Sequence, residues 1–478
     1  MKFKKTFQFR ILFLLFIIGF SSLILVRTFE VSDYWWHVKS GLYILENQSI
    51  PFQDPFSWYG KEINLNWISH EWLGAVILAL FHSVFGSQFG GYLFNIICLL
   101  SSFVLLFLFN EKSFFKNIRF TFIWTTLGLA LASSSLNARP QLFSVLLLIL
   151  TVGLLEKFKQ NARSKSIWYL PIIAILWANL HGGSSNLVYI IPTLYLLAHL
   201  KAFNLKKWKG ETLSKPQLKQ LFFVTILSFS CLAINPHHTQ IWVYPYENMA
   251  DQFMMSIIQE WRSPDLKLIT DWAFFIQFAI IGIIFIQTEK KIKCHHFLLI
   301  ACFIALNLRS IRFGISLYVV ATFFIFNYIP SIKNHKITQQ YLYILAFAGV
   351  IFLTSSFFPT TFPQQLLQTI VPKEAIQLLQ EIKPKRLYNE YDFGSELIYH
   401  NIPVFIDGRA DLYAKHNLKD AISLTRGTEN TANLLKHYNF DTFLVYKNTS
   451  LANYLSLHSD YELIQETETT LIFIKKNL

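Results

Sequence analysis

Long apolar stretches separated by short polar segments run through the first three quarters of the chain. Stretches of this length with few charges are typical of membrane-spanning helices. Twelve of them are recognised, at about residues 11–27, 73–87, 90–110, 120–136, 140–156, 167–181, 184–200, 220–234, 271–288, 295–309, 312–329 and 341–358. The pattern therefore predicts an α-helical polytopic membrane protein over residues 1–358.

Segment 73–87 is expected to lie along the membrane surface or to re-enter the membrane. Threading all twelve segments through the bilayer would place the basic loops 111–119 and 157–166 outside, against the positive-inside rule. With eleven spans, the N-terminus is cytoplasmic and the C-terminus extracytoplasmic. More than half of the 42 lysines and arginines then lie in cytoplasmic loops. The net charge of +13 is explained by this orientation, so no nucleic acid is expected as a partner.

The composition supports a membrane protein, with 53% hydrophobic and only 15% charged residues. The four cysteines lie in or beside apolar segments, so a disulfide framework is not expected. The N-terminal apolar run lacks a cleavage site of small residues and is therefore interpreted as an uncleaved first span.

From about residue 373 the pattern changes to short alternating elements. Helices are predicted over 373–383, 417–424 and 430–440, strands over 386–391, 402–407 and 440–446, and a hairpin over 461–476. Strands that alternate with helices predict a small α/β domain. We place this domain, residues 373–478, outside the membrane, after a linker at 359–372.

The first outer loop, residues 28–89, carries the strongest catalytic candidates. Asp33 and His37 are four residues apart, so on a helix that begins at Ser32 they share one face. A carboxylate beside low-dielectric material has a raised pKa and can act as a general base. The alternative for Asp33 is a surface residue at a helix start. Glu71 is a second catalytic candidate, or a carboxylate that favours a helix N-terminus.

Asp54 lies within a Pro-rich turn sequence and is interpreted as structural. Polar side chains elsewhere also gather at the predicted outer face, where ionisable groups near a membrane usually have a function. Guanidinium groups suit phosphate recognition, although any one of them could instead be an interfacial residue that extends toward water. The candidate substrate-binding residues are His70, Arg139, His181, Arg262, Arg309 and Arg312.

A metal site is not assigned. Suitable ligand atoms are present on Asp33, His37, His70 and Glu71, so a divalent cation is a possible cofactor. These residues do not have the close spacing of a motif such as HExxH. The sequence contains no P-loop, no dinucleotide-binding glycine pattern and no nucleophile elbow. Soluble nucleotide chemistry and serine hydrolysis are therefore disfavoured.

The chain resembles the GT-C membrane glycosyltransferases, in particular the protein O-mannosyltransferase and aminoarabinose transferase group. It is similar to an uncharacterised bacterial branch of that superfamily through several segments along most of the chain. These are SDYWWHVKSGLYI, IPFQDPFSW and WISHEWLG in the first outer loop, then NARPQ, WANLHGG, INPHH and EWRSP, and finally VFIDGRADLY in the C-terminal domain.

The resemblance implies transfer of a sugar from a polyprenyl-phosphate donor, with inversion, at the outer face of the bacterial cytoplasmic membrane. The acceptor would be a glycan, a lipid or a protein. The catalytic aspartate of the first loop corresponds to Asp33, whereas the second acid found next to it in many relatives is replaced by Tyr34. His37 or Glu71 would orient the acceptor, and Arg139, Arg309 or Arg312 would neutralise the leaving phosphate.

Four tryptophans of the first outer loop, Trp35, Trp36, Trp58 and Trp67, are candidates for stacking on sugar or for anchoring at the interface. Two other functions are considered. The first is a non-enzymatic scaffold in the assembly or export of envelope polysaccharide. The second is a transporter, which is disfavoured because its functional groups would lie in the middle of the membrane rather than at one face.

Overall fold

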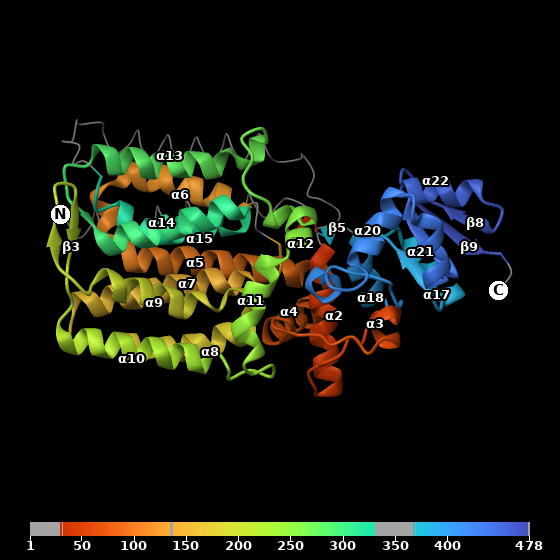
Figure 1. Ribbon diagram of the computed structural model, residues 1–478, viewed down its shortest axis with the longest axis horizontal. Helices are drawn as coiled ribbons and strands as arrows, with labels where there is room; N and C mark the ends of the chain where they lie inside the picture. Colours follow the sequence, from red (N-terminus) through yellow and green to blue (C-terminus); the bar gives the residue numbers. More distant parts are fainter. Residues whose placement is uncertain (1–28, 31, 134–136, 330–366, 369, 477–478) are drawn as a thin grey trace.

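The computed structural model describes residues 29–30, 32–133, 137–329, 367–368 and 370–476, and consists of a long helical bundle joined to a smaller C-terminal domain (Figure 1). The apolar segments predicted at 11–27 and 341–358 lie outside these residues. Every other predicted apolar segment forms a helix, because its side chains can be buried only when its backbone polar groups bond within the segment.

The helices of the bundle lie side by side along its length (Figure 1). They are α5 (Ser87–Lys116), α6 (Ile118–Ser133), α7 (Leu142–Gln160), α8 (Leu170–Leu180), α9 (Leu187–Ala198), α10 (Lys215–Cys231), α13 (Trp272–Gln287), α14 (Cys294–Arg309) and α15 (Gly314–Ile325). Within the described residues, Phe89–Lys116 and Ile269–Gln287 are long and apolar enough to cross a membrane. Other apolar helices, such as Cys294–Arg309, are shorter, so the total of eleven spans stays a prediction.

The two ends of the bundle differ. One end carries a small basic sheet of β2 (Phe203–Asn204), β3 (Trp208–Gly210) and β4 (Ile292–Lys293). The opposite end carries α2 (Ser32–Asn47), α4 (Trp72–Phe85), α11 (Gln240–Ala250) and α12 (Gln252–Ile257), next to the C-terminal domain (Figure 1). Single turns of 3₁₀ helix connect these elements: η1 (Ser166–Tyr169), η2 (Gly182–Ser184), η3 (Gln259–Trp261), η4 (Ile269–Asp271) and η5 (Ile311–Phe313).

Residues 28–89, here called the first loop, form α2 as predicted, then α3 (Trp58–Glu62) and α4. Helices α2 and α4 cross closely at Gly41, where a Cβ atom would lie 2.2 Å from the carbonyl oxygen of Ala75. Only glycine permits this approach. Helix α4 has 14 residues, fewer than a membrane span needs. Helices α8, α9 and α15, which are predicted to span, are shorter still, so the surface or re-entrant position of α4 stays a prediction.

The C-terminal domain is an α/β structure. Its helices are α17 (Lys373–Ile382), α18 (Gly394–Tyr399), α19 (Ala410–Tyr413), α20 (Leu418–Arg426), α21 (Thr431–Tyr438) and α22 (Ser450–Leu457), with η6 (Tyr391–Phe393). Its strands β6 (Leu387–Asn389), β7 (Thr442–Tyr446), β8 (Tyr461–Glu466) and β9 (Thr470–Lys475) form a sheet in the order β6-β7-β9-β8. The predicted C-terminal hairpin is confirmed as β8 and β9, which pair antiparallel.

The strand predicted over 402–407 is wrong. This segment is extended and buried but joins no strand of the sheet. Val404 instead forms an isolated parallel bridge with Ser57 of the first loop. The side chain of Asn389 satisfies the backbone of the neighbouring residues, accepting from the amide of Phe405 and donating to the carbonyl of Ile406. Side-chain bonds therefore replace the strand pairing that the pattern predicts.

The first loop and the C-terminal domain share one apolar core. Trp36, Trp58 and Trp67 are buried in it together with side chains of the C-terminal domain. Trp58 donates a 2.9 Å hydrogen bond to the carbonyl of Leu387 and stacks on Phe405. These three tryptophans pack against protein side chains, and Trp36 and Trp67 also line a small cavity beside Glu71, so stacking on sugar stays a prediction.

A buried ion cluster ties the same two parts together. Arg409 is almost fully buried and lies 2.8 Å from Asp54 of the first loop and 2.6 Å from Asp407. Its guanidinium carbon also lies 4.6 Å from the ring centre of Trp67. Asp54 accepts hydrogen bonds from the amides of Phe56 and Ser57, so it shapes the predicted turn as well. Its role is structural, as the sequence indicates.

A second link between these parts is β1 (Phe29–Glu30), which pairs parallel with β5 (Leu367–Gln368). The start of the first loop and the start of the C-terminal region therefore lie side by side. Together with the shared core, this pairing places the first loop between the bundle and the C-terminal domain.

Candidate active site

Asp33, the second residue of α2, lies where the bundle meets the C-terminal domain. Its Oδ2 atom is 3.1 Å from Nη1 of Arg139, which comes from the connection between α6 and α7. The same Nη1 atom lies 2.7 Å from Oε1 of Glu260 in η3. One guanidinium therefore bridges two carboxylates, and the Asp33 side chain keeps 20% of its surface exposed.

The surroundings of Asp33 favour a base. Burial raises the pKa of this carboxyl group above its ordinary value, the guanidinium of Arg139 opposes the shift, and the charge of Glu260 adds to it. A carboxylate with a raised pKa has a greater affinity for a proton and is a better general base near neutral pH.

Glu71, directly before α4, is surrounded by three histidines. Its carboxylate oxygens lie 3.0 Å from Nε2 of His181, 3.3 Å from Nε2 of His70 and 3.4 Å from Nε2 of His37. Burial acts to raise the pKa of Glu71, but the three imidazoles outweigh burial and hold this pKa well below its ordinary value. Glu71 is therefore a stable carboxylate that orients the histidines.

The three histidines differ in the direction of their pKa shifts. Burial lowers the pKa of His37 to about 3, so its ring is neutral at physiological pH. Burial likewise lowers the pKa of His181. The pKa of His70 is raised, since Glu71 and Asp411 outweigh the effect of burial. The pKa values of Asp33 and Glu71 are thus shifted in opposite directions, an arrangement that suits a base beside a carboxylate that positions other groups.

His181 connects Glu71 to the cationic part of the site. Its Nδ1 atom lies 2.6 Å from Oγ of Ser144 at the start of α7 and 2.9 Å from Oγ of Ser184. Its Nε2 atom lies 3.4 Å from Nη2 of Arg312. The carbon of the Arg312 guanidinium is 5.4 Å from the ring centre of Trp261, a cation–π distance. Arg312 thus lies at the edge of the histidine cluster.

Two of the four candidate arginines lie elsewhere. Nη2 of Arg262 lies 2.8 Å from Oδ1 of Asp271, a pairing that holds the loop before α13. Arg309 is exposed, and its Nη2 atom donates a 2.8 Å bond to the carbonyl of Met249. The structure places Asp33 and Arg139 in one group with Glu260, and Arg312 against His181 of the Glu71 cluster, whereas the side chains of Arg262 and Arg309 bind elsewhere.

Helix α11 and the C-terminal domain contribute residues that the sequence did not single out. Tyr244 of α11 packs on the ring of His70, at 4.3 Å between centres, and donates a 2.8 Å hydrogen bond to Asp411. Gly408 lies against Asp33, where a Cβ atom would be 2.3 Å from Oδ1. A small cavity is lined by Trp36, Ser40, Trp67, Ser69, His70, Glu71, Ala75 and Asp411.

The sequence pointed to the segments that hold most of these residues, but not to the residues themselves. Gly408 and Asp411 belong to VFIDGRADLY, and Glu260 begins EWRSP, both of which carry the family resemblance. Neither segment identifies which of its residues reaches the first loop. The suspected metal set is also divided, because His37, His70 and Glu71 come together whereas Asp33 pairs with Arg139.

Replacement of Arg139 by methionine is expected to change the pH dependence of the reaction. Arg139 opposes the upward shift of the Asp33 pKa, so its removal raises that pKa further. With Asp33 as the base of the transfer proposed below, which must be deprotonated to act, the acidic limb of the pH–rate profile is expected to move to higher pH. Arg262→Met is the control. Arg262 pairs with Asp271 rather than with Asp33, so the pH–rate profile of this variant should stay unchanged. An unshifted acidic limb in Arg139→Met would contradict the effect of Arg139 on the pKa of Asp33.

No protein-family model matches the sequence, and no curated protein matches it. Among solved structures, the cryo-EM structure of the arabinofuranosyltransferase AftD from Mycobacteria is similar, with a TM-score of 0.53 and 9% sequence identity. The likeness supports a GT-C-like fold. It covers 97% of this chain and 41% of that chain, so the present chain spans less than half of the neighbour's length. At this identity the likeness concerns the fold alone.

Proposed function

We propose that the protein is a membrane glycosyltransferase that moves a sugar, with inversion, from a polyprenyl-phosphate donor to an acceptor hydroxyl. The observation that carries the proposal is the Asp33 carboxylate, held beside Arg139 with a raised pKa. A base next to fixed cations suits a reaction in which one group loses a proton while a phosphate leaves. The GT-C-like fold supports the same class of reaction.

In the proposed reaction, Asp33 accepts the proton of the acceptor hydroxyl. The acceptor oxygen forms a bond to the anomeric carbon as the bond from that carbon to the donor phosphate oxygen breaks. The polyprenyl phosphate leaves with the electron pair of that bond, and Arg312 offsets its charge. Among the described residues, Arg312 forms no ion pair with a carboxylate, so its guanidinium is available for a phosphate.

A small apolar cavity lies within the bundle. Its volume is about 40 Å³, and residues of α5, α6, α7 and α15 line it. Its lining includes Leu142, three residues after Arg139, and Ile315, three residues after Arg312. This volume is too small for an isoprenoid chain, so a chain that enters between these helices would displace apolar side chains, with its phosphate end toward the starts of α7 and α15. Apolar contact with such a chain is favourable because it removes hydrocarbon surface from water.

The proposal is tested with the full chain in proteoliposomes. Radiolabelled polyprenyl-phosphate sugars are supplied together with an extract of envelope acceptors, and release of polyprenyl phosphate and labelling of the acceptor are measured. We expect transfer from the lipid-linked donors and none from nucleotide sugars. Transfer from a nucleotide sugar without lipid would overturn the donor assignment. Failure with every donor would favour the scaffold alternative.

Replacement of Arg312 by methionine is expected to weaken binding of the lipid donor. Charge-assisted hydrogen bonds contribute about 1.5–3 kcal/mol, so KM for the donor rises by about one to two orders of magnitude. Arg309→Met is the matched control, since Arg309 lies three residues away and is exposed. Its KM stays near that of the unmodified protein. Equal effects of the two substitutions would contradict a specific role for Arg312.

A further inference from the structure

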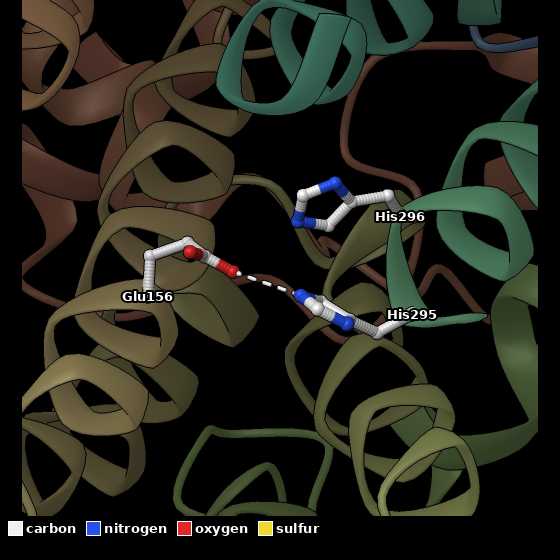
Figure 2. A group of neighbouring side chains, drawn as sticks. All are labelled: Glu156, His295 and His296. Atoms are coloured by element: carbon white, nitrogen blue, oxygen red, sulfur yellow. Dashed lines mark ion pairs between the residues drawn. The ribbon is translucent and has the colours of Figure 1, made fainter. Parts of the chain in front are cut away.

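A second cluster of ligating side chains lies at the end of the bundle that carries the small sheet. Glu156 comes from the last turns of α7, and His295 and His296 come from the first turn of α14 (Figure 2). Each offers one ligand atom, and these atoms all lie within 4.8 Å of one another. His295 and His296 are 1% and 3% exposed, and Nε2 of His295 lies 3.5 Å from Oε1 of Glu156.

This cluster is separate from the candidate active site. Ser144, which contacts His181, and Glu156 lie on the same helix, twelve residues apart. At 1.5 Å per residue the two positions are about 18 Å apart along the axis. The catalytic proposal therefore uses none of these residues.

A buried histidine next to the cluster provides an independent indication of a ligand. His199, at the end of α9, is 0% exposed, and its Nδ1 atom lies 2.7 Å from the carbonyl oxygen of Tyr195. Nδ1 must carry the hydrogen in order to donate to a carbonyl, so Nε2 presents a lone pair. Among the described residues that Nε2 atom has no hydrogen-bond partner, and the ring centre lies 4.5 Å from that of His295.

The hydrogen bonds of the cluster have the form found around metal ions. A ligating histidine usually binds a partner through its other ring nitrogen, which fixes the orientation of the ring. His199 does so through Tyr195, and Nδ1 of His296 lies 2.7 Å from the hydroxyl of Tyr328. Tyr195 also donates its hydroxyl hydrogen to Glu156. These contacts orient imidazole and carboxylate groups toward one another.

We propose that Glu156, His295 and His296 bind a divalent transition-metal ion, zinc in the first place, with His199 as the neighbouring fourth donor. Imidazole nitrogen and carboxylate oxygen are zinc ligands. Tetrahedral coordination at Zn–N distances of about 2.0–2.1 Å places ligand atoms about 3.4 Å apart, so small side-chain rotations close the site. The ion would tie α7, α14 and α9 together beside the small sheet.

Lys159 is the competitor for this site. Its Nζ atom lies 2.9 Å from Nε2 of His295 and 3.5 Å from Oε2 of Glu211. An ammonium group and a metal ion cannot share the lone pair of one imidazole. Metal binding therefore requires Lys159 to move to Glu211, and removal of this lysine should strengthen binding. A purely structural polar cluster would show no such response.

The test uses the full chain without a histidine tag, treated with a chelator and titrated with Zn²⁺ against a fluorescent zinc indicator. Co²⁺ absorption spectra report whether nitrogen and oxygen ligands surround the ion. We expect about one ion per chain, as the ligand count of one site requires. Glu156→Gln and His295→Ala should lower the affinity by about a hundredfold or more, and Lys159→Met should raise it by about tenfold.

His437→Ala is the control, because His437 is an exposed histidine of the C-terminal domain. Its affinity for Zn²⁺ should equal that of the unmodified chain. Glu156→Gln preserves the size of the side chain, so a change in its metal affinity without a change in melting temperature reports ligation rather than folding. Binding that is equal in all variants, or the absence of binding from both the unmodified chain and Lys159→Met, would overturn the proposal.

Discussion

Replacement of Asp33 by asparagine is expected to abolish glycosyl transfer while the protein still folds. An amide cannot accept the proton of the acceptor hydroxyl, and general-base catalysis contributes about 10²–10⁴ in rate. Arg139 keeps its 2.7 Å contact with Glu260, so the substitution leaves no guanidinium unpaired at the site. The measurement is the initial rate of sugar transfer in proteoliposomes at equal protein content.

Asp265→Asn is the matched control for this prediction. Asp265 is an exposed carboxylate in the loop before α13, where its side chain accepts from the amide of Lys267. Asparagine can form the same bond, so transfer should be unaffected. Asp33→Glu should keep part of the activity, since it moves the base without removing it. Full activity in Asp33→Asn would contradict the assignment of Asp33 as the base.

Replacement of Arg409 by leucine is expected to cause the largest loss of stability. Asp54 and Asp407 would become buried carboxylates without their cation, and the side chains of both are 0% exposed. Breaking a buried ion pair from one side costs about 3–5 kcal/mol. The C-terminal domain should separate from the first loop, which lowers the melting temperature of the solubilised protein and increases its cleavage by protease.

Arg386→Leu provides a comparison within the same interface. Arg386 pairs with Glu62 of the first loop at 2.9 Å, but both side chains are substantially exposed. Surface ion pairs contribute at most about 1 kcal/mol, so the melting temperature should change little. The triple variant Asp54→Asn, Asp407→Asn, Arg409→Leu removes the unpaired charges and should recover part of the loss. A small effect of Arg409→Leu alone would contradict the role of this cluster.

The helices were largely predictable because the signal for them is local. An apolar segment near a membrane must bond its own backbone, so 140–156 and 295–309 predict α7 and α14 without knowledge of their neighbours. The helix that begins at Ser32 is also predicted from a local signal, a serine suited to a helix start. The strand prediction for 402–407 was wrong because the pairing partner of this segment, Ser57, is distant in sequence.

The candidate site was predictable only in part. Asp33 and Glu71 stand out because they are carboxylates in an aromatic loop beside apolar segments. Arg139 and Arg262 look equivalent in sequence, but one bridges Asp33 and Glu260 whereas the other pairs with Asp271. A guanidinium at the end of a long flexible side chain takes its direction from its partner, and the chain near it does not specify that partner.

The sequence by itself predicted a helical membrane protein with an acidic, aromatic first loop and an α/β C-terminal domain. Only the tertiary structure decided that Trp58 and Trp67 are buried in a core shared with that domain. It also decided that Gly408 lies against Asp33, and that Asp411 accepts a hydrogen bond from Tyr244, whose ring packs on His70. Apolar periodicity is set by neighbouring residues, whereas the partner of a polar or aromatic side chain is set by which distant segments meet.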